Sequence, residues 1–190
     1  MNLIRFDFAT LPVSPWRNGG GETREIISQP LGDEEFSWRA SIATIAQNGP
    51  FSVFNGIDRS ITLLEGDGVH LFSEGQIDHC LQEIGKPFAF PGDVPVKAAL
   101  LGGSSQDFNI MTRRGYYSAH VQRVVETFGL SLLHAGVFYV LQGEWQLPNG
   151  SLLVARQGCW WQPGSGPLRL VVKGNNAIAL WADIVPVKAA

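Results

Sequence analysis

Short segments in which apolar and polar residues alternate recur along this chain of 190 residues, and glycine or proline separates many of them. Clear examples are residues 22–27, 36–45, 59–64 and 107–114. A period of two residues is typical of β-strands, because successive side chains of a strand point to opposite faces of a sheet. No stretch of a dozen residues shows a convincing helical period of 3.6. The sequence therefore predicts an all-β protein.

The two halves of the chain follow a similar plan. The run ITLLEGDGV in the first half parallels VFYVLQGEWQ in the second, and FAFPGDVPVKAAL parallels CWWQPGSGPLRL. Matched positions lie 77 residues apart for Leu64 and Leu141, and 72 residues apart for Pro91 and Pro163. Two matches at nearly one offset indicate internal duplication of a β unit. We therefore expect a bicupin, meaning two small jelly-roll β-barrels in one chain, with domains at residues 1–115 and 116–190 packed as one globular unit.

Composition and charge argue against several classes of partner. The net charge is −3 and no lysine or arginine run is present, so we expect no nucleic acid partner. No apolar run approaches the roughly 20 residues that cross a bilayer, and the first residues lack the apolar region of a signal peptide, so we expect no membrane partner. Cys80 and Cys159 form no CxxC motif. A reduced, cytoplasmic protein is the simplest interpretation.

The sequence offers little support for a cofactor or a catalytic nucleophile. The four histidines, His70, His79, His120 and His134, form no HxH or HxxxH pair. A transition-metal site needs convergent ligands, so we expect no metal and no other cofactor. No GxSxG nucleophile elbow is present either, and we assign no catalytic residue.

The segment PWRNGGGETREII, residues 15–27, is the most unusual stretch of the chain. Three consecutive glycines, Gly19 to Gly21, allow positive φ angles and close approach of the backbone to another group. The alternation that follows predicts a strand with Thr23 and Glu25 on one face. A phosphate-binding loop is excluded because the GxxxxGK[ST] spacing and its lysine are missing.

Polar residues occupy many of the alternating positions in the first half, and Ser52 and Phe54 are predicted to share one face of a short strand. A barrel interior is apolar unless it holds something, because unpaired polar groups are costly to bury. An arginine with amide and hydroxyl donors beside an aromatic wall suits a small, planar anionic metabolite. The alternative is that Arg39 and Glu25 form a structural ion pair while the serines face solvent. The polar set comprises Asn18, Thr23, Glu25, Arg39, Ser41, Ser52, Arg59 and Asn109.

Four motifs resemble the HutD/Ves family of bacterial bicupins: WRNGGGETREI, WRASIATIAQNGPFSVFNGIDRSITLLEG, FAFPGD and DFNIMTRR. The resemblance covers essentially the whole chain and is sharpest over residues 16–112. It implies a cytoplasmic protein of histidine utilisation, and the intact glycine run favours the HutD branch. That branch is thought to regulate histidine catabolism by binding an intermediate such as urocanate or N-formylglutamate. The family pocket lies in the first barrel, and its motifs hold the polar set above together with Phe108 and Met111.

Three hypotheses remain open at this point. The first is a regulatory binder of a small carboxylate, without catalysis. The second is a metal-independent enzyme that acts on a histidine-degradation intermediate, with Glu25 as acid/base and Arg59 as the carboxylate anchor. The third is a scaffold that acts through protein contacts, for which a homodimer is one form.

Overall fold

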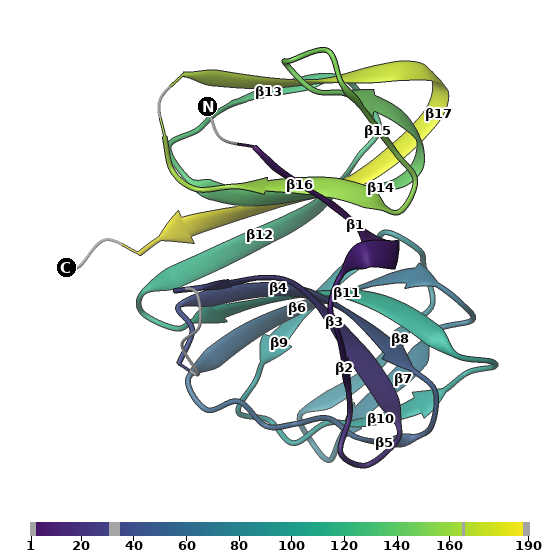
Figure 1. The fold of residues 1–190 in the computed structure, drawn as a ribbon. Helices are drawn as coiled ribbons and strands as arrows, with labels where there is room; N and C mark the ends of the chain where they lie inside the picture. The colour runs from purple at the N-terminus through teal and green to yellow at the C-terminus, as the bar shows by residue number, and fades with distance from the viewer. Residues whose placement is uncertain (1–2, 31–34, 165, 188–190) are drawn as a thin grey trace. The chain divides into compact units, whose positions relative to one another are not determined.

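The computed structural model describes residues 3–30, 35–164 and 166–187, and β-strands are the dominant element of these residues (Figure 1). The predicted all-β class is confirmed, since the helix found in these ranges is a single 3-10 turn, η1 (Phe8–Thr10). No helix in the described ranges is long and apolar enough to cross a membrane. The chain divides into two compact units. Of the described residues, those within 12–118 together with Val187 form the N-terminal unit, and those within 3–11 and 119–186 form the C-terminal unit.

Two antiparallel sheets make up the N-terminal unit, and their strands are short because turns interrupt the alternating segments. The apolar faces of the two sheets share one core, to which Ile61 contributes from one sheet and Leu71 from the other, both fully buried. One sheet has six strands, in the order β2 (Val13–Pro15), β3 (Gly21–Gln29), β4 (Trp38–Ile45), β11 (Ser105–Arg113), β6 (Ile57–Glu65) and β9 (Pro87–Pro91). The other has four, in the order β5 (Gly49–Pro50), β10 (Lys97–Leu100), β7 (Val69–Ser73) and β8 (Ile77–Leu81).

The C-terminal unit has its own sheet and its own core. Phe138 and Trp145 meet edge to face, with ring centroids 5.0 Å apart, and both side chains are fully buried. The sheet order is β1 (Ile4–Asp7), β16 (Gln157–Trp161), β14 (Ala135–Gln146), β17 (Pro167–Pro186) and β12 (Tyr117–Val124), with β13 (Phe128–Ser131) on β17 and β15 (Leu152–Val154) on β14.

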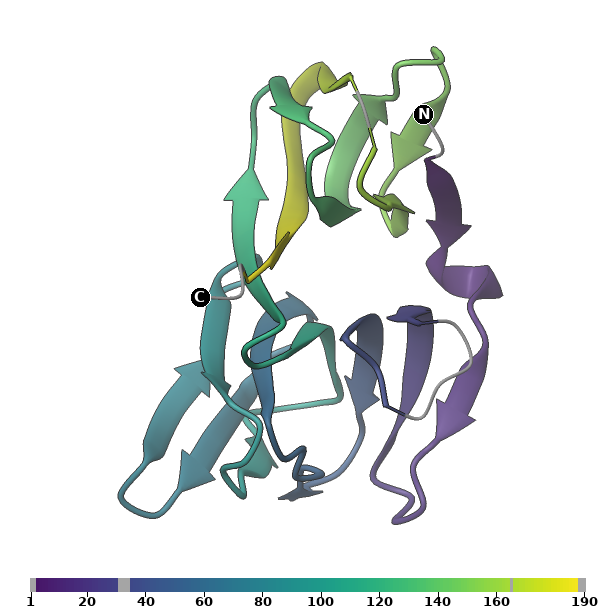
Figure 2. The ribbon, with the colours of Figure 1, turned by 90° about the vertical axis from the view of Figure 1, so that its left-hand side faces the viewer.

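The first strand does not belong where the domain boundaries 1–115 and 116–190 would place it. Ile4 pairs with Trp160 and Asp7 with Gln157, so β1 is an edge strand of the C-terminal sheet. Figure 2 shows this strand, in dark purple, beside the green strands from late in the chain. A boundary drawn at residue 115 misses this arrangement because strand pairing is a long-range contact that local alternation does not reveal.

The short strand expected around Ser52 and Phe54 is not formed. Residues 51–54 have no ladder; instead the Phe51 amide donates to the Val96 carbonyl at 2.8 Å and the Phe54 amide to the Gly92 carbonyl at 2.9 Å. These isolated bonds hold the segment as a loop. We call residues 51–54 the aromatic loop, because Phe51 and Phe54 both belong to the site described next.

Candidate functional site

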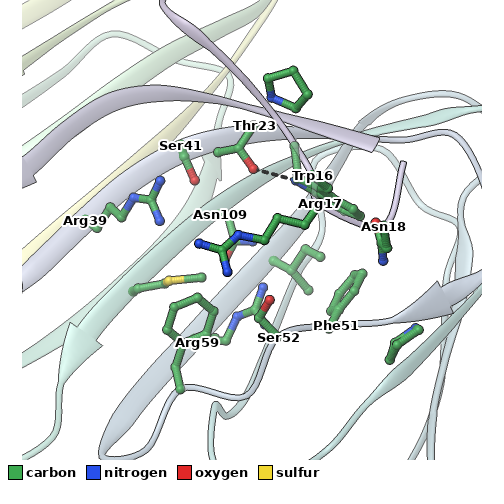
Figure 3. Close-up of a pocket in the computed structure, with 16 residues that line it drawn as sticks. Trp16, Arg17, Asn18, Thr23, Arg39, Ser41, Phe51, Ser52, Arg59 and Asn109 are labelled. Carbon is green, nitrogen blue, oxygen red and sulfur yellow. Dashed lines mark hydrogen bonds between the residues drawn. The ribbon is translucent and has the colours of Figure 1, made fainter. Parts of the chain in front are cut away.

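A cavity of about 490 Å³ lies in the N-terminal unit, over one face of the six-stranded sheet (Figure 3). Eight of the ten residues proposed from the sequence line it: Asn18, Thr23, Arg39, Ser41, Ser52, Arg59, Asn109 and Met111. The remaining lining residues are Pro15, Trp16, Arg17, Ala43, Pro50, Phe51, Phe54 and Ile61.

Strand register brings the central polar residues together. On β11, Asn109 lies opposite Ser41 of β4 and Ile61 of β6. Two residues further along, Met111 lies opposite Arg39 on one side and Arg59 on the other. Directly opposed residues of an antiparallel pair point to the same face, so these side chains form one patch on the floor of the cavity.

Two residues proposed from the sequence do not line the cavity. Phe108 is fully buried and lies opposite Ile42 and Thr62, on the other face of the sheet from Asn109, because neighbouring residues of a strand point in opposite directions. Glu25 lies beside the cavity, where its Oε2 accepts a hydrogen bond from Arg39 Nε at 2.7 Å. The structural ion pair considered above is therefore present, although the buried Ser41 lines the cavity rather than facing solvent.

Arg59 is the most unusual side chain of the site, because it is charged and only 7% exposed. Its Cζ lies 5.2 Å from the ring centroid of Phe51, 5.6 Å from that of Phe54 and 5.1 Å from that of Phe90. Burial, together with repulsion from Arg39, lowers the pKa of Arg59 to about 10. No carboxylate of the described residues pairs with it, and its Nε has no hydrogen-bond partner there.

Arg17 is one functional candidate that sequence reasoning missed. It lines the cavity on the turn between β2 and β3, and Figure 3 shows its guanidinium directed toward the same space as those of Arg39 and Arg59. Of these three cations, Arg39 alone has a carboxylate partner in the described ranges. The cavity therefore carries excess positive charge and attracts anions. The sequence could have pointed to Arg17 through its position, since it directly precedes Asn18 in the unusual segment of residues 15–27.

Aromatic side chains form the wall of the cavity. Trp16 Nε1 donates to Thr23 Oγ1 at 2.8 Å, a bond that fixes the indole beside the strand (Figure 3). The indole meets Phe51 edge to face, with ring centroids 6.4 Å apart. Phe51 was not identified from the sequence because it lies in the aromatic loop, where no periodicity assigns a face.

The glycine run shapes the turn that carries Trp16, Arg17 and Asn18. Gly19 has a φ of +70°, a positive angle of the kind that the glycine run allows. Asn18 Oδ1 accepts a hydrogen bond from the Gly20 amide at 2.9 Å and so stabilises the turn. At Gly21 the constraint is contact, since a Cβ there would lie 2.2 Å from the Thr44 carbonyl oxygen and 3.1 Å from the Trp16 ring.

We expect Gly21→Ala to destabilise the protein by ~1–3 kcal/mol, because the added methyl group overpacks a site bounded by backbone. Denaturant unfolding of the variant measures this loss. Gly103→Ala is the matched control, since a Cβ at Gly103 meets nothing within 4 Å and its φ is not positive. Equal stabilities of the two variants would contradict the close packing described here.

The cavity itself holds little that could move a proton. Its lining residues include no aspartate, glutamate, histidine, cysteine, lysine or tyrosine within the described ranges. In those ranges no three histidine, cysteine, aspartate or glutamate side chains gather as a metal site would require. Asp107, two residues before Asn109 on the same strand, is fully buried beyond the lining, and burial raises its pKa to about 7.

Comparisons with known proteins agree with this architecture. The family model described as HutD matches residues 8–180. Protein Ves of Cronobacter sakazakii is 48% identical over 167 residues, which cover 87% of this chain and 91% of that protein. Protein Ves of Citrobacter koseri is also 48% identical, over 87% of this chain and 86% of the relative.

Among solved structures, HutD from Pseudomonas fluorescens SBW25 superposes with a TM-score of 0.84 at 29% identity, over 97% of this chain and 99% of that chain. A cupin 2 conserved barrel domain protein from Leptotrichia buccalis has a TM-score of 0.62 at 10% identity over 97% and 98%, which shows a shared cupin-type fold. These identities do not favour the HutD branch over the Ves branch, although the glycine run did. Because the family model matches residues 8–180, most of the length of this chain, the chain belongs to the HutD family.

Proposed function

We propose that this protein binds a small carboxylate in the cavity of its N-terminal unit, without catalysing a reaction. The observation that carries the proposal is the burial of the charged Arg59 side chain. A buried guanidinium that has no carboxylate partner in the described residues is costly, and a ligand carboxylate would supply the missing counterion. The planar guanidinium suits a carboxylate because it can donate two parallel hydrogen bonds.

The surroundings of Arg59 narrow the class of ligand. Trp16, Phe51 and Phe54 offer flat apolar surface, whereas Arg17 and Arg39 extend the positive charge around the same space. A small, flat or short-chain anion fits this combination. Within the histidine-utilisation pathway, to which the family resemblance points, urocanate and N-formylglutamate have this chemistry. We propose that binding one of them serves a regulatory role in histidine catabolism.

An enzymatic role is the second candidate, with Glu25 as acid/base. Glu25 already accepts a hydrogen bond from Arg39, and its side chain is 42% exposed. A general acid or base must reach the reacting atom, and the lining residues found in the described ranges include no group with a pKa near neutrality. These observations favour binding over turnover.

Isothermal titration calorimetry with urocanate and N-formylglutamate tests the proposal, followed by mass spectrometry of the recovered ligand. We expect saturable binding of at least one of the two compounds, and recovery of that compound unchanged. The methyl ester of urocanate is the control and should bind poorly, because it lacks the charge that Arg59 requires. Recovery of a converted product would support the enzyme, and failure of both acids to bind would leave a role through protein contacts.

The barrel architecture, the cellular location and the class of partner also belong to this proposal. We propose that the two compact units are two cupin barrels, supported by their separate sheets and cores and by the cupin-type relatives. We further propose that the protein acts in the cytoplasm and that its partner is a small anionic metabolite, with nucleic acid and membrane excluded as partners. A homodimer is compatible with this role.

A further inference from the structure

Asn109 presents a buried hydrogen-bond acceptor in the floor of the cavity. The residue is 5% exposed, and its Oδ1 has no hydrogen-bond partner among the described residues. Its neighbours across the strands are Ser41 and Ile61, and neither donates a hydrogen bond to this oxygen. Figure 3 shows Asn109 in the same space that the three guanidinium groups approach. A buried acceptor of this kind is seldom left unpaired in a native protein.

The cavity therefore contains two buried polar atoms without hydrogen-bond partners in the described residues, one a donor and the other an acceptor. Arg59 presents a donor, the Nε–H, that has no partner in the described residues, and Asn109 presents an acceptor without one. Both side chains are more than nine-tenths buried and both line the cavity, so one small molecule can contact both. A carboxylate alone can satisfy Arg59 but cannot donate to Asn109, because an ionised carboxylate only accepts hydrogen bonds.

We infer that the ligand is a carboxylate that also carries an N–H or O–H donor, and that Asn109 is the residue that selects for this donor. The inference rests on the proposed function, since it assumes that the carboxylate binds at Arg59. It narrows the ligand class from small carboxylates in general to those with a ring or amide N–H, or a hydroxyl group, placed away from the carboxylate.

The physical basis is the asymmetry of buried hydrogen bonds. A site built to pair with a donor rejects an otherwise identical molecule that lacks it, because the acceptor of the site is then desolvated without compensation. For one neutral acceptor we expect a loss of about 10- to 100-fold in affinity. A ligand with an acceptor at this place should suffer most, since two acceptors would then face each other.

Two flat acids that differ at a single atom provide the test. (E)-3-(pyrrol-2-yl)acrylate carries a ring N–H where (E)-3-(furan-2-yl)acrylate carries an oxygen, and the two are otherwise matched in length and shape. Calorimetry on the full chain should show the pyrrole compound binding about 10- to 100-fold more tightly than the furan compound. Equal or reversed affinities would overturn the inference while leaving the carboxylate site in place. Absence of binding by both acids would remove the carboxylate site and the inference with it.

Asn109→Leu assigns the preference to this residue. The leucine has a similar size and no acceptor, so we expect the variant to bind both acids with affinities that differ less than threefold. Met111→Leu is the matched control, because Met111 lies on the same face of β11, lines the same cavity and offers no strong hydrogen-bonding group. It should keep the preference for the pyrrole compound. Retention of the preference by Asn109→Leu, once circular dichroism shows a native fold, would assign the selection to another residue.

Discussion

Replacing Arg59 with alanine is expected to weaken binding of urocanate or N-formylglutamate by ~2–5 kcal/mol, the usual effect of removing one partner of a buried charge pair. The fold should survive, because Arg59 makes no ion pair within the described residues and water can fill the space. Calorimetry measures the lost affinity and denaturant unfolding measures stability. Arg59→Lys should also bind poorly, since a point charge cannot reproduce two parallel hydrogen bonds.

Two other arginines serve as controls for this result. Arg24→Ala alters the opposite face of β3, where Arg24 pairs with Glu22 outside the cavity, and it should leave binding unchanged. Arg17→Ala removes a cavity cation that is exposed to solvent, so we expect a smaller loss of ~1 kcal/mol or less. If Arg59→Ala bound as tightly as the parent protein, Arg59 could not be the anchor. If it unfolded and the parent bound no ligand, its role would be structural.

Asp107→Asn is expected to stabilise the protein far more at pH 8 than at pH 4. Asp107 is fully buried, one of its oxygens has no partner in the described residues, and Ser105 Oγ donates to the other at 3.1 Å. Burial raises the pKa of Asp107 to about 7, whereas the same group titrates near 3.9 in an unfolded chain. Between these values the folded state keeps a proton that the unfolded state releases.

The sign of the pH effect follows from this difference. Because the folded state binds more protons, stability falls as the pH rises from about 4 to about 7 and then levels off. The full penalty is ~4 kcal/mol, since each pKa unit corresponds to ~1.4 kcal/mol. Asparagine carries no such penalty, so the stability difference between variant and parent should shift by about 4 kcal/mol between pH 4 and pH 8.

Chemical denaturation at the two pH values tests this expectation, and any constant cost of the amide cancels in the comparison. Glu74→Gln is the control, because Glu74 is exposed on the turn between β7 and β8 and should show no comparable pH dependence. If the difference in unfolding free energy between Asp107→Asn and the parent were the same at pH 4 and pH 8, Asp107 would be ionised in the folded protein at both pH values.

Alternation along single strands predicted much of the site. It placed Asn109 and Met111 on one face of a strand and Arg39 and Ser41 on one face of another, and both assignments agree with the cavity lining. The same alternation places Phe108 on the opposite face, so its inclusion followed the family motif against the local pattern. Where the two faces of a sheet differ in burial, the alternating position of a residue along its strand is strong evidence of the face on which its side chain lies.

Other parts of the site could not be derived in this way. The ion pair between Arg39 and Glu25 was considered, but its formation depends on register between β3 and β4, including a bulge after Glu25. Phe51 lies in a loop whose path is fixed by hydrogen bonds to Val96 and Gly92, residues more than 30 positions away. Local sequence carries no information about such contacts, and the same reason explains why β1 was assigned to the wrong unit.

The pairing of β1 with β16 affects the order in which the two units can fold during synthesis. As the ribosome extends the chain, residues 4–7 emerge before the N-terminal unit, but their partner strand β16 is synthesised about 150 residues later. The N-terminal unit, by contrast, draws the strands of both its sheets from residues 13–113. Domains generally fold as units, and early ones fold during synthesis. The cavity of the N-terminal unit can therefore form on the nascent chain before β16, the partner of β1, has been synthesised.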